Sequence, residues 1–255
     1  MDDLFLKKRI HRFFGSGKVE ELDDDIIPES RLLIRLDDHD FIHAVCTPHQ
    51  IEEFVIGFLR TRGLIDGLED IASLHVTGNT ASVVRTSGLR GSLPDLGVLE
   101  TTGTRNLSME SFVRNKKKLT SGRSVSSDIV LKGMEELSRM PLYVKSGGTH
   151  CAILFSWDGH ALASAEDIGR HNAVDKIIGG GMRKNVDFFN TWLAVSGRLP
   201  ADMVLKPLLV GIPLIASVSA PTSGGVELGE RSGLTVVGFV RGGRFNCYSH
   251  PERII

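Results

Sequence analysis

The stretch Glu166-Asp-Ile-Gly-Arg-His-Asn-Ala-Val-Asp-Lys176 places two acids, an Arg, a His, an Asn, an Asp and a Lys around one glycine. The apolar residues 161–165 before it predict a buried strand, and Ile177-Ile178 after it predicts a packed helix. A core element would exclude so many charges, because a buried charge is costly unless it is paired. The polar groups therefore mark a junction between a strand and a helix. Ligands of α/β folds bind at such junctions, and a helix N-terminus favours anions.

The pattern around this junction repeats through the second half of the chain. Apolar stretches typical of strands occur at 152–157, 161–165, 191–195, 214–218 and 234–240, and helical patterns occur at 129–140, 172–182, 201–210 and 223–231. Repeated strand–helix–strand units predict a largely parallel sheet that is covered by helices on both faces.

The first half favours hairpins. Residues 32–36 and 41–45 predict one hairpin, and residues 71–76 and 81–85 predict another around Gly78-Asn79. Between them, Thr47 and Pro48 are suited to the N-cap and first position of a helix.

We expect four segments. Their bounds are 1–30 for an N-terminal extension or edge hairpin, 31–105 for a β-rich subdomain, 106–128 for a mobile loop, and 129–255 for an α/β domain.

Composition excludes several classes of protein. The 255 residues are 41% hydrophobic and 24% charged with a net charge of −1, which is ordinary for a soluble domain and gives no bias toward nucleic acid or membrane. No apolar run reaches the roughly 18 residues that span a bilayer, and the N-terminus does not resemble a signal peptide. Three widely spaced cysteines favour a reducing cytoplasm over a disulfide scaffold.

Four strand ends carry similar polar groups, and the carboxyl ends of parallel strands line one edge of a sheet. The groups expected there are Arg170, Ser196, Gly197, Arg198, Ser219, Thr222, Ser223, Arg241, Gly242, Gly243 and Arg244. Arginine and hydroxyl groups bind phosphate, and glycine lets the backbone approach a ligand closely. Each junction alone could be an ordinary polar loop, whereas all four together predict an anion or nucleotide pocket.

Other residues allow more than one interpretation. His171 could be a general acid or base, or it could cap the helix or hydrogen-bond Glu166 or Asp167. A role as a metal ligand is disfavoured, because no Cys or second His lies close in sequence. Asp175 and Lys176 could form a surface pair or fix the pocket loops. Cys151 follows His150 and is more often a buried core thiol than a reactive one. The sequence shows neither a nucleophile elbow nor a Walker A loop, so an enzyme acting on nucleotides is the weakest alternative.

The ordered motifs resemble the formate dehydrogenase accessory proteins of the FdhD/NarQ family. They are Gly147-Gly-Thr-His-Cys151, 166–176, Val195-Ser-Gly-Arg198, Ser219-Ala-Pro-Thr-Ser223 and Gly238-Phe-Val-Arg-Gly-Gly-Arg-Phe-Asn246, together with Cys46-Thr-Pro48 before a helix. The resemblance covers roughly residues 30 to 253. It implies a cytidine-deaminase-like α/β/α domain and a homodimer.

The resemblance also implies a function in the cytoplasm. Family members pass sulfur from a cysteine desulfurase to the bis-molybdopterin guanine dinucleotide cofactor (Mo-bis-MGD), which then enters formate dehydrogenase. GDP or GMP would mimic this cargo. Phe239 to Arg244 match the family's cofactor-binding loop, which adds Phe239 and Val240 to the predicted binding residues. Asp167, His171, Asn172 and Asp175, which lie in the 166–176 motif, are also expected to contribute to cofactor binding. Zinc is not expected, because deaminases bind zinc through H-x-E and P-C-x-x-C motifs, and the places that match these motifs here, His171-Asn-Ala173 and Pro221-Thr-Ser223, contain neither the Glu nor the cysteines.

The chain departs from the family at the sulfur-carrying position. The family's Cys-x-x-Cys corresponds here to Ser121 and Ser124, and a hydroxyl cannot hold a persulfide. Whether the chain is an enzyme is therefore open. Either Cys151 substitutes for the missing thiols, or the protein is a chaperone that binds the cofactor without carrying sulfur. A loop near Ser121 that covers the pocket is a further hypothesis.

Overall fold

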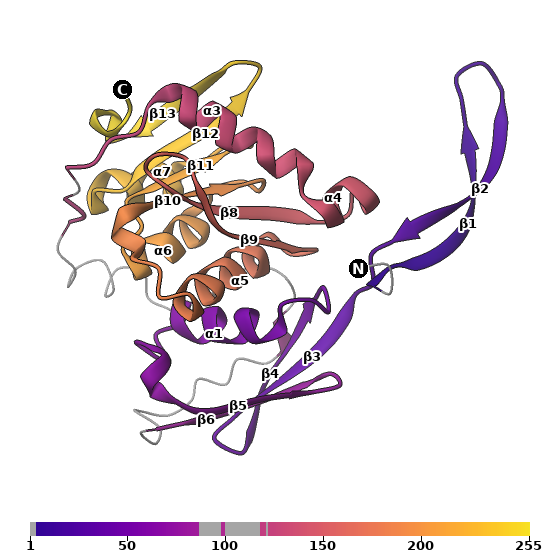
Figure 1. Ribbon diagram of the computed structural model, residues 1–255, viewed down its shortest axis with the longest axis horizontal. Helices are drawn as coiled ribbons and strands as arrows, with labels where there is room; N and C mark the ends of the chain where they lie inside the picture. The colour runs from indigo at the N-terminus through magenta and orange to yellow at the C-terminus, as the bar shows by residue number, and fades with distance from the viewer. Residues whose placement is uncertain (1–3, 87–97, 100–117, 121) are drawn as a thin grey trace.

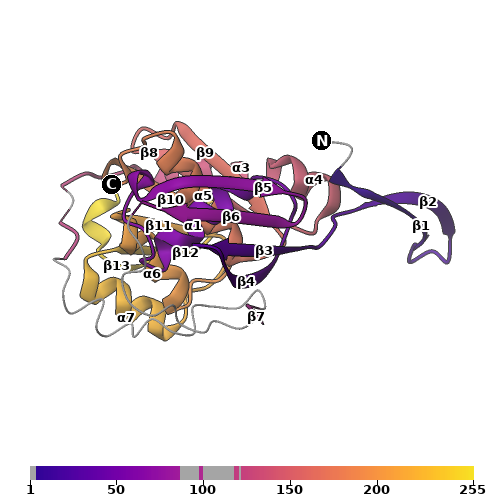
Figure 2. The same cartoon turned by 90° about the horizontal axis from the view of Figure 1, so that it is seen from below.

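The computed structural model describes residues 4–86, 98–99, 118–120 and 122–255, which form the three sheets seen in Figure 1. The first is a hairpin of β1 (Leu6–Phe13) and β2 (Val19–Ile26) that extends away from the body of the molecule (Figures 1 and 2). No helix in the described ranges is long and apolar enough to cross a membrane.

The second sheet has the order β5-β6-β3-β4-β7 and belongs to the first half of the chain. Its strands are β3 (Ser30–Leu36), β4 (His39–Cys46), β5 (Ile71–Thr77), β6 (Thr80–Arg85) and β7 (Val98–Leu99), with the short helix η2 (Leu68–Asp70) before β5. Both predicted hairpins are confirmed. The apolar face of α1 (Ile51–Thr61), including Phe54 and Phe58, packs on this sheet.

Thr47 does not cap the helix, so that prediction is wrong. The helix begins three residues later, after Gln50 in the left-handed region. Thr47 is fully buried instead. Its backbone N–H donates to Asp167 Oδ2 at 3.0 Å, and its hydroxyl accepts a hydrogen bond from Ile168 N at 3.1 Å. The buried carboxylate needs donors, and this requirement outweighs the capping preference of threonine.

The third sheet has the order β13-β12-β11-β10-β8-β9. Its strands are β8 (His150–Ser156), β9 (Ala161–Asp167), β10 (Thr191–Val195), β11 (Leu214–Ser217), β12 (Thr235–Arg241) and β13 (Arg244–Ser249). One face packs on α5 (Arg170–Arg183), α6 (Ala201–Val210) and α7 (Ser223–Ser232). The other packs on α3 (Ser127–Glu136), which η3 (Leu137–Arg139) and α4 (Pro141–Ser146) follow. Two short helices, η4 (Phe188–Asn190) and η5 (Pro251–Arg253), complete this half.

The sheet is mixed rather than largely parallel, which corrects the expectation from sequence. Only β10, β11 and β12 pair in parallel. Tight turns join β8 to β9 and β12 to β13, and such short connections can link only antiparallel neighbours. Strands β9 to β12 nevertheless run in one direction, so the four predicted junctions do share one edge. The fold is therefore mixed α/β with helices on both faces of this sheet.

Helices α1 and α5 join the two halves of the chain (Figure 1). They cross at Gly57 and Gly179, where a Cβ on Gly179 would lie 1.9 Å from the carbonyl oxygen of Glu53. The two backbones can approach so closely only because both residues lack a side chain. Of the predicted loop at 106–128, residues 106–117 and Ser121 lie outside the described residues, and Ser127 already belongs to α3.

Candidate functional site

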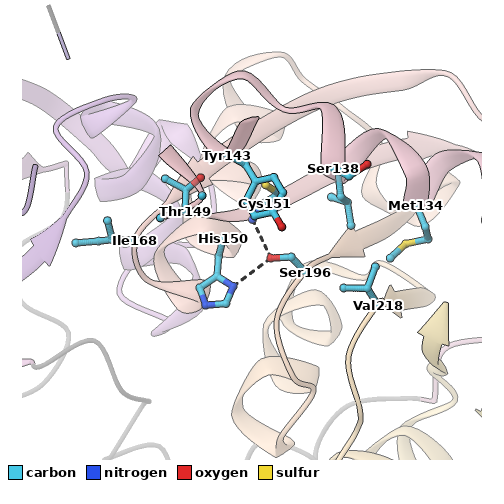
Figure 3. A pocket seen from close by; sticks show the side chains of 12 residues that line it. Met134, Ser138, Tyr143, Thr149, His150, Cys151, Ile168, Ser196 and Val218 are labelled. Carbon is cyan, nitrogen blue, oxygen red and sulfur yellow. Dashed lines mark hydrogen bonds between the residues drawn. The ribbon is translucent and has the colours of Figure 1, made fainter. Parts of the chain in front are cut away.

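A pocket of about 460 Å³ opens where β8 begins and where β9, β10 and β11 end (Figure 3). Its apolar wall comes largely from the α3–η3–α4 segment, and its polar wall comes from the strand ends. The lining residues are Met134, Leu137, Ser138, Tyr143, Gly147, Gly148, Thr149, His150, Cys151, Ile168, Ser196 and Val218. The volume is that of a small-molecule site and suits one nucleotide or one fused ring system.

Ser196 lies at the centre of the polar wall. Its hydroxyl oxygen accepts a hydrogen bond from Cys151 N at 3.0 Å and lies 3.1 Å from His150 Nδ1, as the dashed lines in Figure 3 show. Its backbone N–H donates to Cys151 O at 3.0 Å, which continues the pairing of β8 with β10. Burial lowers the pKa of His150, and the nearby Arg170 lowers it further. His150 is therefore a neutral hydrogen-bonding group at physiological pH.

Glu166 holds the wall behind Cys151 in place. Its carboxylate accepts hydrogen bonds from Leu142 N at 3.0 Å, Tyr143 N at 2.6 Å and the Thr149 hydroxyl at 3.2 Å. The Sγ of Cys151 lies 3.8 Å from the same carboxylate. Glu166 thus binds the N-terminal end of α4 and fixes the apolar wall to the sheet.

All three cysteines lie in the described residues, and each has a raised thiol pKa. Burial, then the charge of Glu166, raises the pKa of Cys151 to about 12. Burial, then the charge of Asp167, raises the pKa of Cys46 to about 12. Burial also raises the pKa of the half-buried Cys247. A thiol attacks sulfur as its thiolate, so these environments oppose persulfide chemistry at neutral pH.

Asp167 is fully buried and serves the fold around the site. It forms an ion pair with Lys176 at 2.7 Å, and both side chains are inaccessible to solvent. Its carboxylate also accepts hydrogen bonds from Thr47 N, from Gly169 N at 2.8 Å and from Asn172 Nδ2 at 2.9 Å. Asp167 and Asn172 therefore attach the N-terminal half to the start of α5.

Asp175 also contacts the interior rather than the pocket. It pairs with Lys206 at 2.7 Å, accepts a hydrogen bond from the Thr61 hydroxyl at 2.7 Å, and lies 3.5 Å from Arg62. Burial lowers the pKa of Lys206 to about 8 despite this partner. The interpretation of Asp175 and Lys176 as a surface pair is wrong, because both are buried and each pairs with a different residue.

Two buried nitrogen atoms beside the pocket have no hydrogen-bond partner among the residues that the structure describes. His171 Nε2 lies 3.0 Å from Asp202 Oδ2. The partner of His171 is therefore Asp202 and not Glu166 or Asp167, which the sequence analysis had offered as alternatives. Within the described residues, His171 Nδ1 and Arg170 Nε are buried without a hydrogen-bond partner. Arg170 packs on Gly197, where a Cβ would lie 2.9 Å from the Cβ of Arg170. Arg170 Nε is therefore a candidate for a contact with a bound anion, whereas the neutral His171 donates through Nε2 to Asp202 and presents a lone pair at Nδ1.

The predicted loop at 239–244 consists of the last three residues of β12, a two-residue turn at Gly242-Gly243, and the first residue of the unexpected strand β13. Phe239, Gly242 and Gly243 have positive φ angles, and Arg241 and Arg244 are exposed. Phe239 N donates to Ser219 O at 3.0 Å. Since Ser219 follows the pocket residue Val218, the arginine turn adjoins the pocket across the end of β11.

The remaining predicted residues are more scattered. Val240 is buried and Arg198 is exposed, and neither lines the pocket. Thr222 is the N-cap of α7 and accepts a hydrogen bond from Gly225 N. Ser124 is half-buried beside Val125, which bridges to Ile254 at the C-terminus. Ser121, and with it the loop proposed to cover the pocket, lies outside the described residues.

Sequence reasoning missed the apolar wall. Helix α4 was not expected, although Pro141 at its first turn is a usual start signal. Met134 and Leu137 fall on the predicted helix at 129–140, but nothing in their spacing indicates that they face a pocket. Within the described residues, no group of three His, Cys, Asp or Glu side chains is placed to hold a metal ion.

Comparisons with known proteins give one consistent result. A sequence model of the FdhD/NarQ family matches residues 27–255. The chain is 35% identical to the "Sulfur carrier protein FdhD" of Methanothermobacter thermautotrophicus, over 98% of this chain and 99% of that one. It is 34% identical to the protein of the same name from Sulfurisphaera tokodaii, over 97% and 99%. A crystal structure of a formate dehydrogenase accessory protein from Desulfotalea psychrophila is similar, with a TM-score of 0.81 and 28% identity over 99% of this chain and 100% of that one.

Proposed function

Because this chain belongs to the FdhD/NarQ family, we propose that it is a cytoplasmic maturation factor for a formate dehydrogenase and that it binds Mo-bis-MGD as its cargo. The observation that carries the proposal is the pocket of about 460 Å³ beside the exposed arginine turn. One nucleotide unit of the cofactor fills the pocket, and the phosphates lie outside it. The deaminase-like fold and the homodimer are part of this proposal.

The two walls of the pocket suit the two sides of a flat heterocycle. Met134, Leu137 and Tyr143 offer apolar contact, and Ser196 and His150 offer hydrogen bonds to ring edges. A neutral His150 can donate or accept, depending on its tautomer.

The phosphates of the cargo would lie between the pocket and the arginine turn. Arg241 and Arg244 are exposed there, and Arg170 Nε has no hydrogen-bond partner among the described residues. Guanidinium groups bind phosphate through paired donors. Asp167, Asn172 and Asp175 act indirectly, since they fix the start of α5 that carries Arg170 and His171.

The test is to purify the protein from cells that make Mo-bis-MGD and to analyse the small molecules released by acid. We expect guanine nucleotide and pterin in proportion to protein, and neither from cells that cannot attach the nucleotide. A protein that is folded but carries no guanine nucleotide or pterin from either host would contradict the proposal.

The cysteines favour a second candidate, in which the protein binds and delivers the cofactor without carrying sulfur. Ser121 and Ser124 replace the family's sulfur-carrying pair, and the pKa values of Cys46 and Cys151 are raised to about 12. Incubation with a cysteine desulfurase and cysteine, followed by intact mass measurement, separates the two. A persulfide on Cys151 that reduction removes would support a carrier with a relocated thiol. The absence of any adduct on a protein that binds the cofactor would support the second candidate.

A further inference from the structure

Most hydrogen-bond donors that line the pocket are already used within the protein. The hydroxyl of Ser138 donates to Glu135 O at 2.7 Å, and the hydroxyl of Thr149 donates to the Glu166 carboxylate at 3.2 Å. Backbone N–H groups are used in the same way at Gly147, Gly148, Cys151 and Ile168. A ligand in the pocket therefore meets few free donors, and these few decide which ligand atoms can be satisfied.

The contact between His150 and Ser196 fixes where the imidazole proton lies. The Ser196 hydroxyl oxygen already accepts a hydrogen bond from Cys151 N at 3.0 Å, and His150 Nδ1 lies 3.1 Å from it. Within the part of the chain that the structure describes, Nδ1 is the only acceptor left for the hydroxyl proton of Ser196. A neutral imidazole has one N–H, so a serine that donates to Nδ1 places the ring proton on Nε2.

His150 Nε2 is then a free donor in the polar wall. No described residue accepts a hydrogen bond from it, and Figure 3 shows the ring with this nitrogen turned away from Ser196. The ring is half-buried, and burial together with the charge of Arg170 lowers its pKa, so it carries a single proton. Tyr143, whose hydroxyl is also unused by the described residues, is 39% exposed and less shielded from water.

We propose that His150, held by Ser196 with its proton on Nε2, selects a purine that has a carbonyl oxygen at position 6. The inference rests on the proposed function, in which the pocket holds one nucleotide unit of the cargo. Guanine presents the acceptor O6 to this donor, whereas adenine presents an amino group, which would set two donors against each other. A site that hydrogen-bonds one group discriminates against an analogue that cannot make the bond.

The ligand atom that faces His150 decides whether the two purines are distinguished. N7 is an acceptor in both guanine and adenine, and the phosphates of the two nucleotides are the same. A contact of His150 with N7 or with phosphate would therefore bind GDP and ADP alike. In the proposed arrangement the phosphates lie toward Arg241 and Arg244, which leaves the base beside His150.

The position of the proton can be measured without any ligand. Long-range nitrogen–proton NMR spectra of protein with isotopically labelled histidine show which ring nitrogen is protonated, and His150→Gln assigns the signal among the nine histidines. We expect the wild-type ring to be protonated at Nε2. Ser196→Ala removes the hydroxyl that makes Nδ1 an acceptor, so the other tautomer should appear in that variant. A wild-type ring that is protonated at Nδ1 would overturn the proposal.

The selection is measured by calorimetric titration with GDP, inosine diphosphate and ADP. The wild type should bind ADP at least about tenfold more weakly than GDP, and inosine diphosphate, which keeps O6, within about threefold of GDP. Ser196→Ala frees the ring to adopt either tautomer, and His150→Gln supplies an amide that can turn its N–H or its oxygen to the base. Each should lower the GDP-to-ADP affinity ratio at least about threefold. A merely structural effect would weaken both nucleotides equally and leave this ratio unchanged.

The matched control is His160→Gln, in the turn at the other end of β8, where the His160 side chain is 81% exposed. It should retain the wild-type affinities for GDP and ADP. Equal binding of GDP and ADP by the wild type, or a ratio that neither Ser196→Ala nor His150→Gln lowers, would overturn the selection by His150 and leave the proposed function standing. A wild type that binds neither nucleotide would overturn the proposed function, and the selection with it.

Discussion

The crossing of α1 and α5 gives opposite predictions for two neighbouring glycines, Gly179 and Gly180. A Cβ on Gly179 would lie 1.9 Å from Glu53 O and 2.9 Å from Gly57 N, which are backbone atoms that cannot rotate away. A Cβ on Gly180 would meet only the Glu53 side chain, at 3.7 Å, which is ordinary contact. Gly179→Ala should therefore force the helices apart, whereas Gly180→Ala should be accepted without movement.

The magnitudes follow from packing and helix propensity. Relief of the clash at position 179 requires the helices to separate by about 1 Å, and because the clashing atoms belong to the backbone we expect the upper end of the usual cost of overpacking, about 3 kcal/mol. An alanine in a helix gains about 0.8–1 kcal/mol over glycine. The net expectation is a loss of about 2 kcal/mol for Gly179→Ala and a gain of up to about 1 kcal/mol for Gly180→Ala.

Thermal unfolding and urea titration of the two variants measure this difference. For a chain of this size, about 1 kcal/mol shifts Tm by roughly 2–4 °C. Gly179→Ala should melt about 4–8 °C below the wild type, and Gly180→Ala should melt at or above it. Equal stability of the two variants would refute the inference that the two halves are joined by direct backbone packing.

Three further predictions concern the site and its surroundings. Arg244→Ala should weaken GDP binding at least tenfold, or ~1.4 kcal/mol, in a calorimetric titration. The control Arg231→Ala, at the far end of α7, should leave GDP binding unchanged. Equal affinity of the two variants for GDP would remove the assignment of Arg244 to phosphate binding. Iodoacetamide at pH 7.5 should alkylate Cys151 roughly 10³-fold more slowly in the folded protein than in urea, because the pKa of this thiol is raised from 9.0 to about 12 in the folded protein. Similar alkylation rates in the two states would contradict this and show that the folded protein presents an accessible thiolate. Between pH 8 and 10.5 the unfolded chain holds the Lys206 proton that the folded chain has lost, so the contribution of Lys206 to stability should rise with pH. Urea titrations should show this rise flattened in Lys206→Met, and an identical pH profile would contradict it.

The sheet edge on which the candidate site lies could be predicted from the sequence, because strand ends follow from local patterns. Apolar stretches fix β9, β10, β11 and β12, and their shared direction brings the polar junctions to one edge. The direction of β8 and the presence of β13 could not be predicted so simply. Turn residues such as Asp158-Gly159 and Gly242-Gly243 suit hairpins, and they decide that the sheet is mixed.

Individual roles within the site were harder to predict, because burial and partners are properties of the tertiary structure. Asp167 and Asp175 look like ligand-binding acids in sequence, yet the packing of α1 against α5 buries both and supplies Lys176 and Lys206 as partners. The apolar wall of the pocket was not predicted, because an apolar side chain such as that of Met134 carries no functional group that distinguishes a pocket residue from a core residue.

The most direct test of the proposed cofactor site is to block the pocket and measure GDP binding by calorimetry. Ser138 lines the pocket but is exposed on η3, so Ser138→Trp should fill the space without disturbing the core. Glu136→Trp is the matched control, because Glu136 is exposed on the adjoining α3 but does not line the pocket. The proposed site predicts that Ser138→Trp abolishes GDP binding and that Glu136→Trp retains it. Equal binding of GDP by both variants would contradict the assignment of the pocket to the guanine nucleotide.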